Sequence, residues 1–235
     1  MRKATALSLL ALLAAAASPR PLLAQASSRD LPTVAVMDFN GFMLGQTGNS
    51  VPIGKAVSSM LVTELSGREG MRVIERAQLH DLLQEQRLAL SGRVDEGTAI
   101  EVGQMLGVQY MVFGNVTSIV QQVRLDMRAV NVETSEVLEV QKLTDQVDAL
   151  LSLVVKMADL FSAKLELEPP SARPAVAQIP LQATIAFSRG VDFEDRGELE
   201  EAMEMYRMTL EIYPDHRGAR RALDRLEESE GGGLR

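Results

Sequence analysis

Hydrophobic residues recur along this chain with two alternating periods, one typical of strands and one typical of helices. Short β-branched or alternating runs predict strands, and apolar residues spaced three and four apart predict helices. Between residues 33 and 165 the predicted elements follow the order β-α-β-α-α-β-β-β-α. The strands are expected over 33–39, 71–75, 108–120, 122–132 and 137–143, and the helices over 53–66, 76–90, 95–106 and 147–165.

The order of these elements predicts an α/β fold, a mixed sheet packed with helices. The first strands alternate with helices, which favours parallel crossover connections, whereas the last three strands follow one another closely. Turn-forming residues over Asn131–Glu136 separate two strand-like runs and predict an antiparallel hairpin. We therefore expect one α/β domain over residues 33–167.

Beyond residue 167 the pattern changes. Residues 168–180 contain four prolines, which predicts a linker. Residues 181–228 show only the helical period, so a small all-α module is expected there.

The N-terminus has the features of a secretory signal peptide over residues 1–26. Arg2 and Lys3 precede an apolar run over residues 4–17, and Ala24-Gln25-Ala26 fits a small-x-small cleavage site. The run is shorter than the ~20 residues that a bilayer span needs, although an uncleaved anchor remains the alternative. We expect an exported, periplasmic protein, whose association with the outer membrane would depend on a partner.

Charge and cysteine content narrow the range of partners. Removal of residues 1–26 takes away three basic side chains and no acidic one, leaving 21 basic against 32 acidic residues and a net charge of −11. Such a protein repels nucleic acids and anionic lipids, so protein partners are expected, basic ones in particular. The chain has no cysteine, which excludes disulfides, thiolate metal sites and an N-terminal lipid on cysteine.

A glycine-rich connection before the helix over 53–66 comes close to a phosphate-binding loop. Such a loop needs four residues between its first glycine and the Gly-Lys pair, but five separate Gly48 from Gly54. Ala56 stands where a hydroxyl would bind magnesium, and Pro52 lacks an N–H for the phosphate. A flexible loop and a helix start are predicted instead.

Other candidate chemistry also fails on spacing. Asp192, Glu194 and Gly197 fit positions 1, 3 and 6 of a calcium loop, but Arg196 and Met203 occupy positions that need oxygen ligands. A solvated helix face is expected there.

No metal, cofactor or catalytic residue is predicted. His80 and His216 have no metal ligand at suitable spacing and are expected at the surface. Asp38, at the end of the first predicted strand, leaves an enzyme as a minor alternative, because an isolated carboxylate seldom makes a site.

Several of these runs resemble the CsgG family, the curli production assembly/transport component. The resemblance covers about residues 33–165 and is most specific at Glu75-Arg76, over residues 85–99, and at Gly103 with Leu106-Gly107 before a strand. It implies an envelope protein made with a signal peptide. The best-known members of the family form a ring-shaped outer-membrane channel that exports curli subunits.

The chain departs from those channel members in ways that affect function. They resemble lipoproteins, but no cysteine is present here, so anchoring by lipid is not expected. They also carry two inserted β-hairpins per subunit, and residues 115–147 leave no room for them. We therefore expect the sheet without the channel.

The C-terminal segment adds a resemblance to one tetratricopeptide repeat. The match consists of small, aromatic and helix-ending residues at offsets 0, 3, 12, 16, 19 and 24, namely Gly190, Phe193, Ala202, Tyr206, Thr209 and Pro214. A generic helical hairpin is the alternative. One repeat is marginal alone, so it should dock on the first domain, on another subunit or on a partner.

Together these features predict a non-enzymatic periplasmic scaffold or adaptor for outer-membrane assembly or curli-type secretion. The expected partner-binding groove lies on the first helix of the repeat and is lined by Thr184, Phe187, Val191, Glu194 and Asp195. Two alternatives stay open. One is a ring-forming secretion component beside a separate pore, and the other is a periplasmic regulator of a cell-wall synthase.

Overall fold

A computed structural model describes residues 31–44, 50–74, 78–80, 83, 96–119, 121–169 and 179–232 of the chain. Residues 31–235 form one compact unit. The predicted signal peptide, most of the predicted helix over 76–90 and most of the predicted linker lie outside the described residues.

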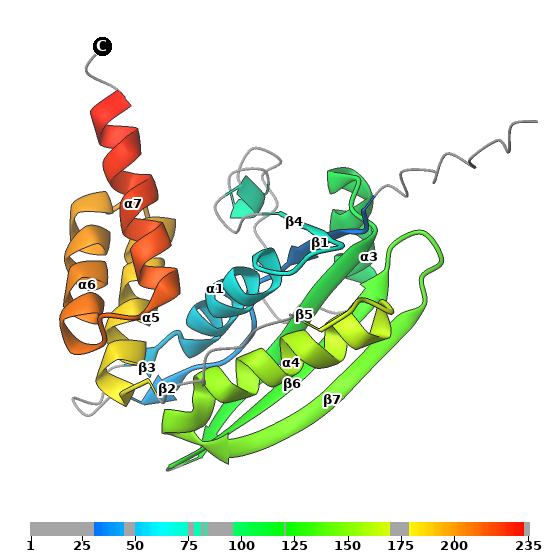
Figure 1. Ribbon diagram of the computed structural model, residues 1–235, viewed down its shortest axis with the longest axis horizontal. Helices are drawn as coiled ribbons and strands as arrows, with labels where there is room; N and C mark the ends of the chain where they lie inside the picture. Colours follow the sequence, from blue (N-terminus) through cyan, green and yellow to red (C-terminus); the bar gives the residue numbers. More distant parts are fainter. Residues whose placement is uncertain are drawn as a thin grey trace, which may run out of the picture. The chain divides into compact units, whose positions relative to one another are not determined.

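The centre of the structure is a five-stranded mixed sheet in the order β4-β1-β5-β6-β7 (Figure 1). Strand β1 (Thr33–Val36) runs parallel to both β4 (Arg72–Val73) and β5 (Tyr110–Ile119). Strands β6 (Gln122–Asn131) and β7 (Val137–Gln146) continue the sheet as an antiparallel meander. The predicted α/β fold with a mixed sheet is therefore confirmed.

The turn between β6 and β7 forms where the sequence predicts it. Asn131 accepts hydrogen bonds from the N–H groups of Glu133 and Thr134 through its side-chain oxygen, both at 3.0 Å. This local bond is the usual reason why asparagine begins a turn. The strand after the turn is three residues longer than predicted, and a single 3₁₀ turn (Val147–Ala149) precedes α4 (Leu150–Lys164).

Helices cover both faces of the sheet. Alternate residues of a strand point to opposite faces, so Val34 and Val36 join the core that holds α1 (Ile53–Ser66) and α4. Ala35 packs on the other face with residues of α3 (Glu96–Leu106). Burial of both faces explains why β1 is a continuous apolar run.

The glycine-rich connection contains a short hairpin that the sequence did not predict. Strands β2 (Met43–Leu44) and β3 (Ser50–Val51) pair antiparallel, and each is only two residues long. Gly54 opens α1 at a point where a Cβ would lie 1.9 Å from the carbonyl oxygen of Phe39. Close backbone packing accounts for this glycine.

Three helices complete the chain: α5 (Leu181–Asp195), α6 (Leu199–Ile212) and α7 (Arg217–Gly232). Helices α5 and α6 pack on each other, with Gly197 at φ +75° in the turn between them. Helix α5 also packs along α1, so α1 is enclosed by the sheet unit on one side and by this helical module, α5–α7, on the other. Within the described part of the chain, no helix combines the length and apolarity needed to cross a membrane.

Candidate functional site

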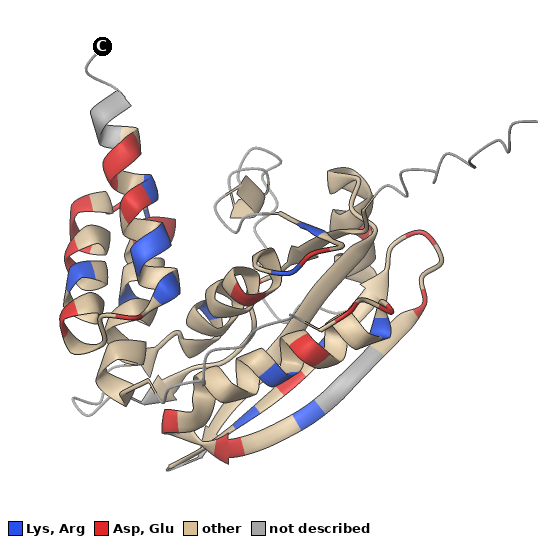
Figure 2. Cartoon of the chain, viewed as in Figure 1, with Lys and Arg blue, Asp and Glu red and all other residues tan. Residues whose placement is uncertain are grey.

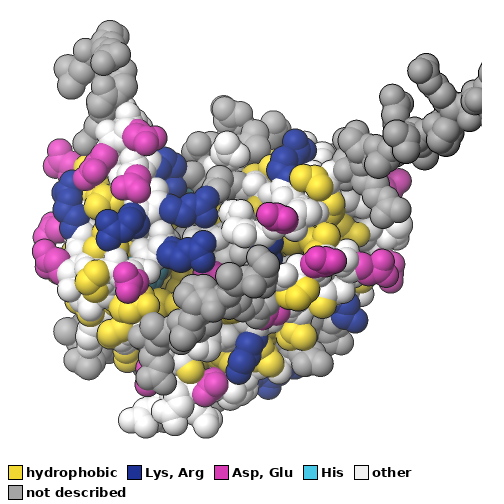
Figure 3. Space-filling view, viewed as in Figure 1, with side chains coloured by type: hydrophobic (Ala, Val, Ile, Leu, Met, Phe, Trp, Pro, Cys, Tyr) yellow, Lys and Arg dark blue, Asp and Glu magenta, His cyan; other side chains and the backbone are white. Residues whose placement is uncertain are grey.

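Several polar side chains that join distant parts of the chain lie along the seam where α1 meets α5 and α7. On the face shown in Figure 3, basic side chains gather over α7, while acidic ones lie farther out. Figure 2 shows the same charges on the ribbon, with acidic residues along α6. We consider this seam, α1 with α5 and α7, as the candidate functional site.

Lys55 ties the start of α1 to the end of α5. Its Nζ lies 2.8 Å from Asp192 Oδ1 and 2.8 Å from Asp195 Oδ2. The side chain of Asp195 is only 7% exposed, and His80 Nδ1 lies 3.8 Å from its other oxygen. The lysine that follows the glycine-rich connection is thus held by two carboxylates of the same chain.

These contacts set the protonation of Lys55. Burial alone would lower the pKa of its ammonium group, but hydrogen bonds and charge attraction from Asp192 and Asp195 outweigh burial and raise the pKa. Lys55 is therefore charged at neutral pH. Beside it, Ser188 Oγ donates a hydrogen bond of 2.9 Å to the carbonyl oxygen of Pro52 and adds a neutral link between the two helices.

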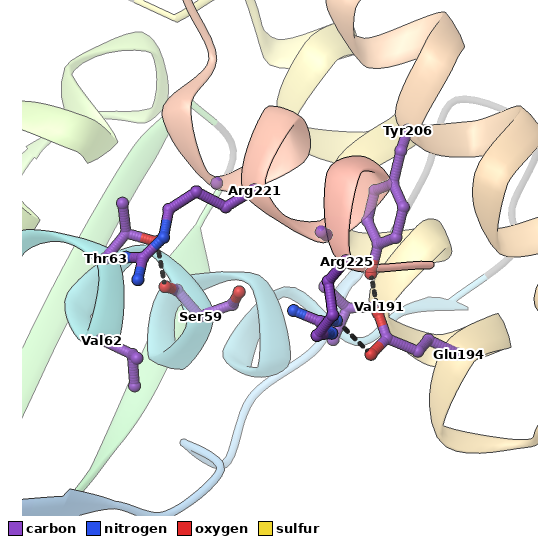
Figure 4. A pocket seen from close by; sticks show the side chains of 10 residues that line it. Ser59, Val62, Thr63, Val191, Glu194, Tyr206, Arg221 and Arg225 are labelled. Carbon is purple, nitrogen blue, oxygen red and sulfur yellow. Dashed lines mark hydrogen bonds and ion pairs between the residues drawn. The ribbon is translucent and has the colours of Figure 1, made fainter. Parts of the chain in front are cut away.

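Farther along the seam, residues of α1, α5, α6 and α7 line a small open cleft (Figure 4). Tyr206 Oη donates a hydrogen bond of 2.7 Å to Glu194 Oε2. Arg225 Nη2 donates to the other oxygen of the same carboxylate. Arg221 and Thr63 line the cleft opposite this group. One carboxylate thereby joins α5, α6 and α7.

His216 occupies the start of α7, and its prediction as a surface residue is wrong. The side chain is 2% exposed, because the ring of Phe187 packs against it at a centroid distance of 4.4 Å. Its Nδ1 accepts a hydrogen bond of 3.1 Å from the N–H of Ala219, which caps the helix. Burial lowers the pKa of His216 to about 4.

The predicted partner groove lies inside the seam. Thr184, Phe187 and Val191 are buried, and α5 packs along α1 of the same chain. Glu194 and Asp195, expected to face a basic partner, accept from Arg225 and Lys55 instead. The chain's own helix and basic residues thus occupy the place expected for a partner.

The predicted packing residues lie between α5 and α6. A Cβ on Gly190 would lie 2.6 Å from the ring of Tyr206, so glycine permits this ring to pack on α5. Ala202 is fully buried, and Phe193 is half-buried with the guanidinium of Arg196 4.6 Å from its ring centre. Pro214 follows the end of α6, and its carbonyl oxygen accepts from Arg220.

The chemistry of the seam is that of fixed charge pairs. Within the described residues, no group of three or more metal-binding side chains comes together. Asp38 follows β1 and is half-buried. Sequence reasoning missed Lys55 and Arg225 as partners of α5, since no local pattern links residues that are 137 and 31 positions apart.

The chain has distant similarity to solved structures. It is similar to the LpoB C-terminal domain from Escherichia coli, with 18% identity, a TM-score of 0.40, and coverage of 49% of this chain and 83% of that one. It is also similar to lipoprotein GNA1162 from Neisseria meningitidis, with 14% identity, a TM-score of 0.41, and coverage of 56% and 96%. For TolB from Acinetobacter baumannii the identity is 12% and the TM-score 0.40; the match covers 57% of this chain but 28% of TolB.

A comparison with curated proteins finds no match. A family model does match part of the sequence, from within the predicted signal peptide to the end of β5, which leaves β6, β7 and α4 outside the match. The predicted resemblance is therefore confirmed in part: residues 16–120 match the family described as curli production assembly/transport component CsgG.

Proposed function

We propose that this protein is a non-enzymatic scaffold or adaptor of the bacterial envelope, exported to the periplasm, where it binds other proteins. In this proposal a CsgG-like α/β unit carries a tetratricopeptide-like module made of α5, α6 and α7. The match of residues 16–120 to the CsgG family supports the envelope setting.

The saturation of the charged groups in the seam is the observation that carries the proposal. Lys55 pairs with two carboxylates, and Glu194 accepts from both Tyr206 and Arg225. Catalysis by acid, base or nucleophile needs a group held ready for a substrate. Groups that satisfy one another instead hold helices in a fixed arrangement, and a preorganised surface is what a binding module needs.

The connections in the meander support a role without the family's channel. Strands β5 and β6 are joined by residues 120–121, and β6 and β7 by residues 132–136. Such short connections leave no space for an inserted hairpin. The partners we propose are therefore proteins of the envelope, and the net charge of −11 after signal removal favours basic ones.

Fractionation of a Gram-negative host that expresses the full chain tests the setting. We expect osmotic shock to release a protein that begins at Ser27, because residues 1–26 are read as a cleaved signal. The matched control is Leu12→Arg, which interrupts the apolar run and should keep the uncleaved chain in the cytoplasm. Recovery of the unaltered chain in the cytoplasm with Met1 still present would contradict the proposal.

A further inference from the structure

The outer face of α6 carries an apolar stripe that the seam does not use. Met205, Met208 and Ile212 are spaced i, i+3 and i+7 and so lie on one side of the helix. Met208 is 41% exposed and Ile212 is 39% exposed. The opposite side of α6 packs against α5 and α7 through buried residues, among them Ala202 and Tyr206.

Acidic side chains surround this stripe. Helix α6, the residue before it and the turn after it carry six carboxylates, on Glu198, Glu200, Glu201, Glu204, Glu211 and Asp215. The same stretch has one basic residue, Arg207, which pairs with Glu227 of α7 at 3.0 Å. Figure 2 shows acidic residues along α6. The stripe is therefore apolar at its centre and negative around it.

We propose that this outer face of α6 binds a basic amphipathic helix of a protein partner. The stripe covers about two helical turns, or roughly 10 Å, which matches the i, i+3, i+7 contacts of a helix laid on an apolar surface. Methionine side chains are flexible and polarizable, so they adapt to the shape of a partner. Basic residues beside the partner's apolar stripe would meet the acidic rim and guide the encounter.

Other occupants fit these observations less well. A second copy related by two-fold symmetry would place the same acidic rim on both sides of the interface, and like charges facing each other oppose association. Nucleic acid and anionic lipid would meet the same repulsion. The inference rests on the proposed function, because it names the surface with which the adaptor would take its partner.

A designed peptide tests the surface directly. The probe is a fluorescent 16-residue helix of leucine and lysine, with leucine at i, i+3, i+4 and i+7, titrated with the exported protein and followed by anisotropy. We expect saturable binding, and at least about tenfold weaker binding to the Met208→Gln/Ile212→Gln variant, which removes the apolar contact without changing the charge. The control Met105→Gln alters a residue on α3 that is 49% exposed and should leave binding unchanged.

A charge reversal tests the contribution of the acidic residues separately from that of the apolar stripe, and a folding control accompanies it. Glu204→Lys/Glu211→Lys should weaken the lysine peptide severalfold and favour a matched leucine–glutamate peptide, because the sign of the rim changes. Circular dichroism and urea midpoints should show that both double variants remain folded, since all four side chains point outward. A charge-reversed rim that binds both peptides as before would overturn the proposal.

Three other results would reject the α6 stripe as the site for a partner helix. Equal binding by the Met208→Gln/Ile212→Gln variant and the unaltered protein would show that the stripe is not the binding surface and would overturn the proposal. Self-association that the Met208→Gln/Ile212→Gln variant abolishes would replace the partner helix by a second copy and overturn the inference. Failure of the peptide to bind a protein that is exported and processed as expected would reject this surface while leaving the adaptor proposal standing.

Discussion

His216 links the stability of the helical module to pH. Its Nδ1 must be unprotonated to accept the N–H of Ala219, and its Nε2 has no hydrogen-bond partner among the described residues. Burial disfavours the charged ring, and this lowers the pKa of His216 from 6.5 to about 4, so the folded protein favours the neutral form. The contribution to stability is complete above pH 6.5 and is lost as pH falls to about 4.

We expect His216→Asn to remove this pH dependence, because asparagine can cap α7 but does not titrate. Between roughly pH 7.5 and pH 5, the unaltered protein should lose about 2 kcal/mol more unfolding free energy than the variant. Urea denaturation at the two pH values measures the difference. Parallel losses in the two proteins would show that His216 does not cause the acid sensitivity.

Lys55 provides a second test at the scale of single residues. We expect Lys55→Met to lower the unfolding free energy by about 2 to 3 kcal/mol at neutral pH, because it removes the ammonium group that pairs with the nearly buried Asp195 carboxylate. Adding Asp195→Asn should restore part of the loss. Since the pKa of Lys55 is raised, the pair should persist at neutral pH and weaken only in strongly alkaline solution.

An exposed ion pair gives the matched control for Lys55. Arg207→Met breaks the pair with Glu227, in which both side chains are about half exposed, and should change the unfolding free energy by less than about 0.5 kcal/mol. Equal effects of Lys55→Met and Arg207→Met would mean that the Lys55 pairs do not hold the seam.

At the scale of elements, the close approach of α5 and α6 depends on one glycine. Gly190→Ala should destabilise the module by about 1 to 3 kcal/mol, because the new methyl group would lie 2.6 Å from the Tyr206 ring. Tyr206→Leu in the same chain should lower the cost of Gly190→Ala, since the clash is removed. A double-mutant cycle of thermal unfolding measures this coupling. Strictly additive effects would contradict the packing described for these helices.

Local patterns were enough to predict most elements but not the site. Helix α1 has the predicted bounds, and the meander follows from alternating runs separated by turn residues. Hairpin β2–β3 was missed because two-residue strands carry no periodicity. His216 gave no sign of burial, since the ring of Phe187 that covers it lies 29 positions earlier. The ion pairs of Lys55 and Arg225 and the burial of His216 all depend on contacts between residues that are far apart in the sequence.

At the scale of the whole molecule, the α/β unit and the helical module form one body. Lys55, Ser188 and the pair of Arg217 with Glu64 fasten the module to α1 at separate points along the seam. The face of α5 that could have received a partner is thereby covered. Surfaces that point outward, among them the stripe on α6, stay exposed.

We have proposed that the protein acts as a small adaptor through such outward surfaces. Light scattering of the exported protein across a concentration series is the decisive test. We predict the mass of a monomer or dimer at every concentration, because the acidic surface opposes extensive self-association. A closed assembly of many subunits with a fixed mass would contradict it and favour a ring-forming secretion component.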